Sequence, residues 1–323
     1  MFAAFAVTAI FPVQLVWAVE PAQKVFRVGF VSPYSPSTAT RSLSAFWGRL
    51  RELGYVEGRN LVIEARWADG QNDRLPALMA EVLGRNVDVL VTWTTPAATA
   101  AKNATSIVPI VVTAMGDPVA IGLVAALAHP GGNLTGLSMG FDEGMGGKWL
   151  ELLQETVPRL SQVAVIENPD NPANRAQTKE LEAVAPSLGV KLQLIPVRDL
   201  EAFDRAFAQA HREAQAVLVL ADPLTVHRRE RITALADKYR IPGLYPLLDF
   251  VNVGGLMAYS ANQRVLFRRA AEYVDKILKG AKPGELPIEQ PTQFELAVNL
   301  KTARALGLTI PESILLRADE VVR

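Results

Sequence analysis

The sequence predicts an α/β protein made of two doubly wound, Rossmann-like lobes. Past residue 24, short apolar runs alternate with segments of helical periodicity, a pattern typical of parallel sheets covered by helices on both faces. The 323 residues are enough for two compact lobes or for one large domain. Turn residues cluster at His129–Gly140 (HPGGNLTGLSMG), between two such series, so we expect the same plan in each half.

The first series begins with a helix and strands that the apolar pattern defines. The helix is expected over Arg41–Leu53, because its apolar residues recur on one face and Gly54 suits a C-terminal cap. The strands are expected at Val25–Val31, Leu61–Trp67, Val87–Thr92 and Val108–Thr113.

The second series begins near Gln162 and follows the same rhythm. A helix is expected over Ile232–Tyr239, whose apolar side chains form one stripe. A hydrophobic helix at Val265–Leu278 and a late segment at Gln293–Gly307 come after this series. The strands are expected at Gln162–Glu167, Lys191–Val197 and Ala216–Ala221.

The N-terminal segment carries no charge over its first nineteen residues, MFAAFAVTAIFPVQLVWAV. We interpret residues 1–22 as a cleaved secretory signal, although the usual basic residue after Met1 is missing. A membrane anchor or a misassigned start is the alternative, but Pro12 interrupts the run and its length is marginal for a bilayer. The absence of cysteine agrees with export and excludes disulfides and thiolate chemistry. We therefore expect a soluble periplasmic protein without stable membrane insertion after cleavage.

One turn recurs along the chain, in which a capping residue precedes proline. Each instance could simply start a helix, since proline is well tolerated in the first helical turn. In parallel sheets, however, these turns lie together at the carboxyl edge of the strands, where ligands bind and helix N-termini attract anions. The pattern thus also favours a small-molecule site in a crevice. The four instances are Thr95-Pro96, Asp117-Pro118, Asn171-Pro172 and Asp222-Pro223.

Composition and motifs exclude several other classes of function. Lys+Arg and Asp+Glu are equal at 33 each, so no basic field is available for nucleic acid. The three histidines, His129, His211 and His227, are scattered, and no nucleophile, metal-ligand or dinucleotide motif is present. We expect no catalytic residue, no metal and no cofactor. A carboxylate pair of a secreted α/β enzyme remains as the alternative.

Several segments of the chain carry a combined pattern that is found in one known family. They are VGFVSP (Val28–Pro33), GDPV (Gly116–Val119), AHPGGNLTGLS (Ala128–Ser138), GGLMAYS (Gly254–Ser260), the run Val274–Pro311 and the closing RADEVVR. Together they resemble the ABC-transporter substrate-binding proteins of the tryptophan/tyrosine-binding type. The similarity runs from about residue 24 to the end, and its C-terminal block is the longest part.

This resemblance implies a type I periplasmic-binding fold, in which a multi-stranded hinge joins two lobes that close over a solute. It implies an N-terminal lobe of residues 24–140 plus 263–291 and a C-terminal lobe of residues 141–262 plus 292–323. It also implies delivery of the solute to an ABC permease in the inner membrane by a protein that we expect to be a monomer.

By the same analogy, the ligand contacts lie on turns at the cleft. Asp222 is the strongest candidate, because a carboxylate there suits the ammonium group of an amino-acid-like solute. The first-lobe candidates are Ser32, Tyr34, Ser35, Thr94, Thr95 and Asp117, and the second-lobe candidates are Asn168, Asn171, Asp222 and Asp249.

We conclude from the sequence that the chain is a non-catalytic binding protein for a small amino-acid-like or carboxylate solute. A ligand-sensing subunit of a membrane receptor is the main alternative, and a secreted enzyme is a more distant one.

Overall fold

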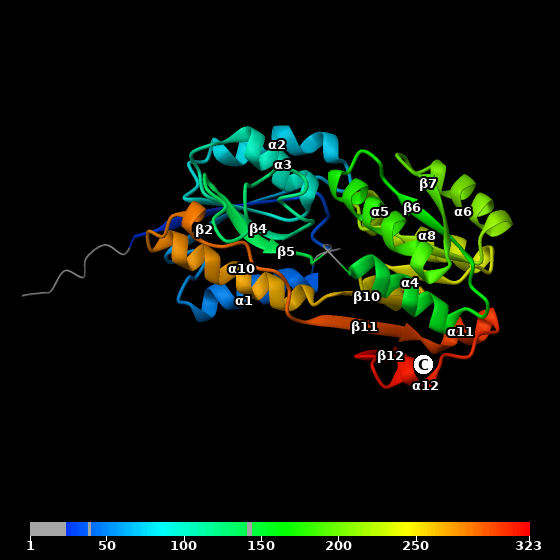
Figure 1. Cartoon of the computed structure of the whole chain (residues 1–323). Helices are drawn as coiled ribbons and strands as arrows, with labels where there is room; N and C mark the ends of the chain where they lie inside the picture. The colour runs from blue at the N-terminus through cyan, green and yellow to red at the C-terminus, as the bar shows by residue number, and fades with distance from the viewer. Residues whose placement is uncertain (1–23, 38–39, 141–143) are drawn as a thin grey trace, which may run out of the picture.

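The computed structural model describes residues 24–37, 40–140 and 144–323, in which strands and helices alternate around two separate sheets (Figure 1). The signal sequence expected at residues 1–22 lies outside the described residues. Each sheet has its own helices, so the chain forms two α/β lobes, as the sequence predicts.

The first sheet is parallel throughout and has the strand order β2-β1-β3-β4-β5. Its central strands are rich in valine and fully buried, because helices cover both faces. Alternate residues serve the two faces: Val28 and Phe30 belong to one core cluster and Val31 to the other. The strands are β1 (Phe26–Ser32), β2 (Leu61–Trp67), β3 (Val89–Thr92), β4 (Ile110–Met115) and β5 (Leu134–Ser138).

Helices from distant parts of the chain cover this sheet. Figure 1 shows α2 (Leu75–Leu83) and α3 (Thr95–Ala104) on one side, with α1 (Thr40–Glu52) and α10 (Gln263–Leu278) on the other. α10 follows strand β10 (Met257–Ala261) of the second sheet, yet it packs against α1 and β4 of the first lobe. An ion pair between Arg49 and Glu272 (2.9 Å) joins the two helices at the surface.

The second sheet has the order β12-β11-β10-β9-β8-β6-β7, and only the β10–β11 pair is antiparallel. Its strands are β6 (Gln162–Glu167), β7 (Lys191–Pro196), β8 (Ala216–Val219), β9 (Gly243–Tyr245), β10 (Met257–Ala261), β11 (Phe294–Asn299) and β12 (Glu320–Val322). The helices of this lobe are α4 (Met145–Thr156), α5 (Pro172–Val184), α6 (Ala202–Glu213), α7 (Pro223–His227), α8 (Arg229–Lys238), α9 (Asp249–Asn252), α11 (Leu300–Leu306) and α12 (Glu312–Leu315). Short 3₁₀ turns lie at Asn72–Arg74, Ala185–Leu188 and Pro283–Glu285.

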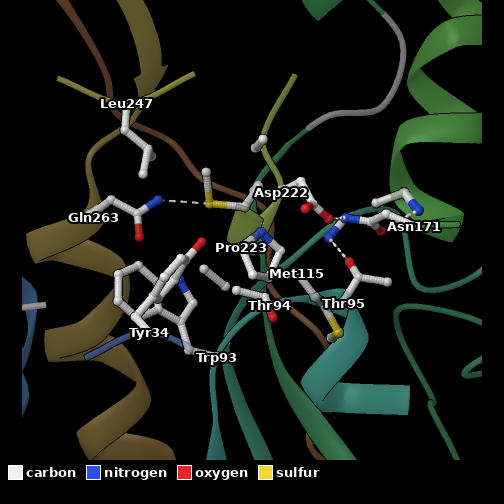
Figure 2. Close-up of a pocket in the computed structure, with 15 residues that line it drawn as sticks. Tyr34, Trp93, Thr94, Thr95, Met115, Asn171, Asp222, Pro223, Leu247 and Gln263 are labelled. Atoms are coloured by element: carbon white, nitrogen blue, oxygen red, sulfur yellow. Dashed lines mark hydrogen bonds between the residues drawn. The ribbon is translucent and has the colours of Figure 1, made fainter. Parts of the chain in front are cut away.

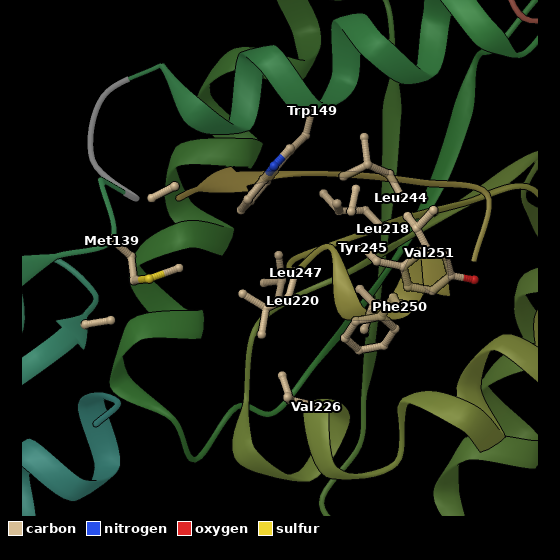
Figure 3. Close-up of a cluster of buried hydrophobic side chains, with 14 of the residues drawn as sticks. Met139, Trp149, Leu218, Leu220, Val226, Leu244, Tyr245, Leu247, Phe250 and Val251 are labelled. Carbon is tan, nitrogen blue, oxygen red and sulfur yellow. The ribbon is translucent and has the colours of Figure 1, made fainter. Parts of the chain in front are cut away.

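The core of the second lobe reaches the region between the lobes (Figure 3). Tyr245 and Phe250 stack at 4.9 Å, and Trp149 of α4 donates a hydrogen bond from its Nε1 to the carbonyl of Tyr259 (2.9 Å). Met139 lies at the edge of this cluster, next to the first lobe, and Leu247 lies within it beside Leu220. Leu247 and Met139 are therefore packed as part of the hydrophobic core.

The chain passes between the lobes after β5, after β10 and before β11. The returning segment pairs with β5, since Ser138 N–H donates to the carbonyl of Glu289 (2.8 Å) and Glu289 N–H donates to that of Gly136 (3.1 Å). These passages form the multi-stranded connection that the family resemblance implies. The exact boundaries of the two lobes stay a prediction.

The structure corrects some of the expected elements. Strands β2 and β6 have the bounds that the sequence predicts. β5 was not expected, because it lies inside the turn cluster at His129–Gly140, and β9 was not expected because it is only three residues long. Asp117-Pro118 opens a turn and no helix: Asp117 Oδ1 accepts hydrogen bonds from the N–H groups of Val119 (2.9 Å) and Ala120 (3.1 Å), and the turn ends at Gly122 with φ 75°. Only three of the four proline turns therefore start helices.

Gly136 offers a test of this architecture. It sits in β5 at φ 140°, and a Cβ there would lie 2.1 Å from the carbonyl oxygen of Val112 in β4. We expect Gly136→Ala to lower the free energy of unfolding by about 3 kcal/mol, because the backbone pair must separate. Gly147→Ala is the matched control, since nothing lies within 4 Å of its Cβ position in α4 and helical alanine gains about 0.5–1 kcal/mol. Equal urea unfolding midpoints for the two variants would contradict this account.

Candidate functional site

A cavity lies between the lobes, where the carboxyl ends of strands from both sheets face each other (Figure 2). It contains about 410 Å³ of empty space, part of it open to solvent. Ligands of open α/β sheets bind at this edge, because the turns there bring helix N-termini and side chains together. Most of the polar side chains described below stand shortly after a strand or at the start of a helix.

Aromatic and thioether side chains form the first-lobe wall of the cavity. The rings of Tyr34 and Trp93 meet edge to face at 4.4 Å, and Trp93 packs in the same way on Phe267 of α10 at 4.8 Å. Met115 and, from the second lobe, Leu247 extend the apolar lining. Burial, and then the nearby carboxylates of Asp222 and Asp249, raise the pKa of Tyr34, so its hydroxyl stays neutral.

Asp222 is the charged group of the cavity and is almost fully buried. It caps α7: its Oδ1 accepts a hydrogen bond from Leu224 N–H (2.9 Å). The amide Nδ2 of Asn168 donates to the same oxygen (3.2 Å), and that of Asn171 donates to Oδ2 (3.0 Å). Burial raises the pKa of Asp222, while these three donors oppose that rise. The carboxylate has neutral donors but no cation from the described chain.

The start of α3 forms a strained corner of the cavity. Thr94 has φ 84° and ψ 158°, an unfavourable conformation for a β-branched residue, and its N–H donates to the carbonyl of Ala114 (2.9 Å). Its Oγ1 is buried and has no hydrogen-bond partner within the part of the chain that the structure describes. The next residue, Thr95, accepts a hydrogen bond from Gly116 N–H (2.9 Å). Such strain is retained where a site requires it.

Gln263 enters the cavity from the first turn of α10. Its Nε2 donates to the sulfur of Met139 (2.7 Å), and its buried Oε1 has no partner among the described residues. Sequence reasoning missed Gln263, because its position at the start of a hydrophobic helix carries no signal of a site. Met139, Met115 and Leu247 were missed for the same reason, as they read as ordinary core residues.

The two lobes touch beside the cavity. A Cβ on Gly116 of the first lobe would lie 2.7 Å from the Cβ of Ala173 in α5 of the second. On another side, a Cβ on Gly70 would lie 3.0 Å from the ring of His227. The absence of side chains at these glycines lets the lobes approach each other closely.

The structure brings five of the ten candidate residues to the cavity wall: Tyr34, Thr94, Thr95, Asn171 and Asp222. Trp93 is buried and also lines the cavity, so it is both a core residue and part of the cavity wall.

The other five candidates lie away from the cavity wall. Ser32 is buried and accepts a hydrogen bond from Tyr34 N–H (3.2 Å), and Ser35 shares a hydrogen bond with Ser37 (3.0 Å). Asp117 faces a separate, open hollow near Lys148. Asn168 stands behind Asp222, and Asp249 begins α9, where burial raises its pKa against the opposing charges of Arg229 and Arg41.

Within the described residues, no group of His, Cys, Asp or Glu could hold a metal ion. No helix of that part of the chain is long and apolar enough to cross a bilayer.

This architecture, two α/β lobes with a polar and aromatic cavity between them, defines a type I periplasmic-binding fold. The chain belongs to the ABC transporter substrate binding protein family, whose model matches residues 34–322. The family resemblance, the fold class and a substrate-binding rather than enzymatic function, all expected from the sequence, are thereby confirmed.

Three relatives illustrate the similarity. A tyrosine-binding protein of Clostridioides difficile is 26% identical over 270 residues, which cover 83% of this chain and 77% of the relative. The crystal structure of a conserved domain protein from Vibrio cholerae has a TM-score of 0.87 at 28% identity, covering 92% of this chain and 100% of that one. The ABC domain from Streptococcus pneumoniae in complex with L-Trp has a TM-score of 0.87 at 24% identity, over 93% of this chain and 100% of that one.

Proposed function

We propose that this substrate-binding protein captures an amino acid with an aromatic side chain and delivers it to the permease of an ABC importer. The observation that carries the proposal is the buried Asp222 carboxylate, which faces an aromatic cavity and lacks a cationic partner among the described residues. Burying such a charge is costly unless it is paired, so a solute ammonium group is the complementary partner.

The carboxylate of an amino acid also has a complementary group in the cavity, the N-terminus of α3. The first N–H groups of a helix have no partner inside the helix and attract anions. α3 presents such an end to the cavity, next to the unpartnered Oγ1 of Thr94. We assign the solute carboxylate to this corner.

The side chain of the solute would lie against the apolar lining. Tyr34 and Trp93 present ring surfaces, which favour another aromatic ring in an edge-to-face or offset arrangement. The named ligands of two relatives, tyrosine and L-Trp, agree with this chemistry.

We further propose that the protein is exported to the periplasm, works there as a monomer and docks on an inner-membrane permease. The uncharged N-terminal segment supports export. The mass of the N-terminal peptide of protein recovered from the periplasm tests this. Cleavage near residues 18–22 is expected, and an intact Met1 on cytosolic protein would contradict it.

The ligand class can be tested by calorimetric titration with L-tyrosine, L-tryptophan, tyramine and desaminotyrosine. Tyramine lacks the carboxylate, and desaminotyrosine lacks the ammonium group. We expect at least one of the two amino acids to bind. Loss of the carboxylate or of the ammonium group from the ligand should weaken binding about tenfold or more, because a hydrogen bond to a charged group contributes ~1.5–3 kcal/mol. Desaminotyrosine binding as tightly as L-tyrosine would remove Asp222 from the site.

Closure of the lobes can be tested at their point of contact. Gly116→Ala should weaken amino-acid binding about tenfold or more, because its Cβ would lie 2.7 Å from that of Ala173 and hold the lobes apart. Gly116 does not have a left-handed backbone, and within the first lobe the nearest atom to the new Cβ would be Thr95 Oγ1 at 3.4 Å, so little adjustment is needed in the open form. Adding Ala173→Gly to this variant should restore most of the affinity.

The controls for closure are Ala173→Gly alone and Gly147→Ala, both of which should bind like the wild type. If the double variant binds as weakly as Gly116→Ala, the contact does not limit closure.

A further inference from the structure

Behind the cavity, four buried amide side chains are spaced three residues apart: Asn168, Asn171, Asn174 and Gln177. The first two lie in the turn after β6, and the other two are in α5. Buried amides are normally hydrogen-bonded. These bond mainly to one another and to the turn that carries Asp222, while the Nε2 of Gln177 has no partner among the described residues.

Asn168 is the member that reaches Asp222 without lining the cavity. Its Nδ2 donates to Asp222 Oδ1 (3.2 Å), and its own Oδ1 accepts a hydrogen bond from Asp170 N–H (3.1 Å). This second bond fixes which end of the amide faces Asp222, so Asn168 presents a donor and not an acceptor.

Asn174, which is fully buried, holds Asn168 in place. Its Oδ1 accepts a hydrogen bond from the backbone N–H of Asn168 (3.0 Å), and its Nδ2 donates to the carbonyl of Ala221 (2.9 Å). One side chain thus ties the turn after β6 to the end of the segment that follows β8. The distance between Asn168 and Asp222 is thereby set by the fold and does not depend on the solute.

We propose that Asn168 is a positioning residue, which keeps the Asp222 carboxylate ionised and in one orientation before the solute arrives. The inference rests on the proposed function in that Asp222 is taken to receive the solute ammonium group. Asn168 itself would not touch the solute.

The physical reason is that Asp222 is buried without a cation from the described chain. Burial raises the pKa of Asp222, the hydrogen bonds from Leu224 N–H, Asn168 and Asn171 lower it, and the charge of Asp170 raises it. Tyr34, the titratable group across the cavity, is neutral. A protonated Asp222 cannot pair with an ammonium group as a carboxylate does. Affinity should therefore be lost as the pH falls through the pKa of Asp222, and the loss should begin at higher pH without Asn168.

The first measurement needs no ligand. In the wild type and in Asn168→Leu, the carboxyl carbon of Asp222 is followed by NMR from about pH 3 to about pH 8. We expect the midpoint to rise by about one pH unit in Asn168→Leu, which corresponds to ~1.4 kcal/mol for the lost hydrogen bond. An unchanged midpoint would overturn the proposal.

A second variant guards against loss of folding in Asn168→Leu. Asn168→Asp keeps an acceptor for Asp170 N–H but places a carboxyl group beside Asp222, so the pair should titrate at still higher pH. Gln177→Leu is the matched control, because this buried amide contacts Asn174 and not Asp222. It can lower the melting temperature, but it should leave the midpoint of Asp222 unchanged. A shift in Gln177→Leu equal to that in Asn168→Leu would assign the effect to general loosening.

The second measurement is the affinity for L-tryptophan between about pH 4.5 and about pH 7.5, with Asp222→Asn as reference. Asn168→Leu should lose affinity at a pH about one unit higher than the wild type. Wild-type affinity in Asp222→Asn would refute the assigned ammonium contact while leaving the ligand-free result intact. A loss in Asp222→Asn, with the wild-type pH profile kept by Asn168→Leu, would refute the role of Asn168 alone.

Discussion

The two sheets face each other with the carboxyl ends of their parallel strands, and this constraint organises the rest of the molecule. A parallel strand must be followed by a crossover, so the turn after each strand lies at the same edge. Tyr34, Trp93 and Gly116 follow β1, β3 and β4, while Asp222 comes after β8. Side chains that are far apart in sequence therefore share one cavity without any local motif.

The same arrangement creates an electrostatic problem. Where the lobes meet, polar groups lose contact with water. Asp222 is buried without a countercharge from the described residues, and the Oγ1 of Thr94 and the Oε1 of Gln263 are buried without a hydrogen-bond partner among them. The protein supplies neutral donors to Asp222 but no countercharge from its described residues. A zwitterionic solute would provide the missing partners, so the binding energy arises partly from groups that are unsatisfied without it.

The residues that fix the side chains of the site differ from those that allow the two lobes to approach each other. The amides of α5 and its preceding turn hold the carboxylate, and the aromatic contact between Trp93 and Phe267 ties the first-lobe wall to α10. Gly116 and Gly70 lie where the lobes touch, since a side chain there would meet Ala173 or His227. The site is thus preorganised within each lobe, and the fit between lobes depends on the absence of two side chains.

The sequence by itself determined the alternation of strands and helices, the two-lobed plan and the family, because apolar periodicity and extended motifs are local properties of the chain. Through the family resemblance it also predicted Tyr34, Thr94, Thr95, Asn171 and Asp222 as cleft residues, and these five line the cavity. Their contact with a solute stays a prediction. Only the tertiary structure placed Asp117 in a helix-free turn and brought Gln263, Met139 and Leu247 into the cavity. The tertiary structure also showed that Asn168, expected to contact the ligand, lies behind Asp222 and donates a hydrogen bond to it. These roles depend on which lobe a segment packs against and on which way its side chain points. For Asn168 and Gln263, contacts with residues 54 and 124 positions away in the sequence decide both.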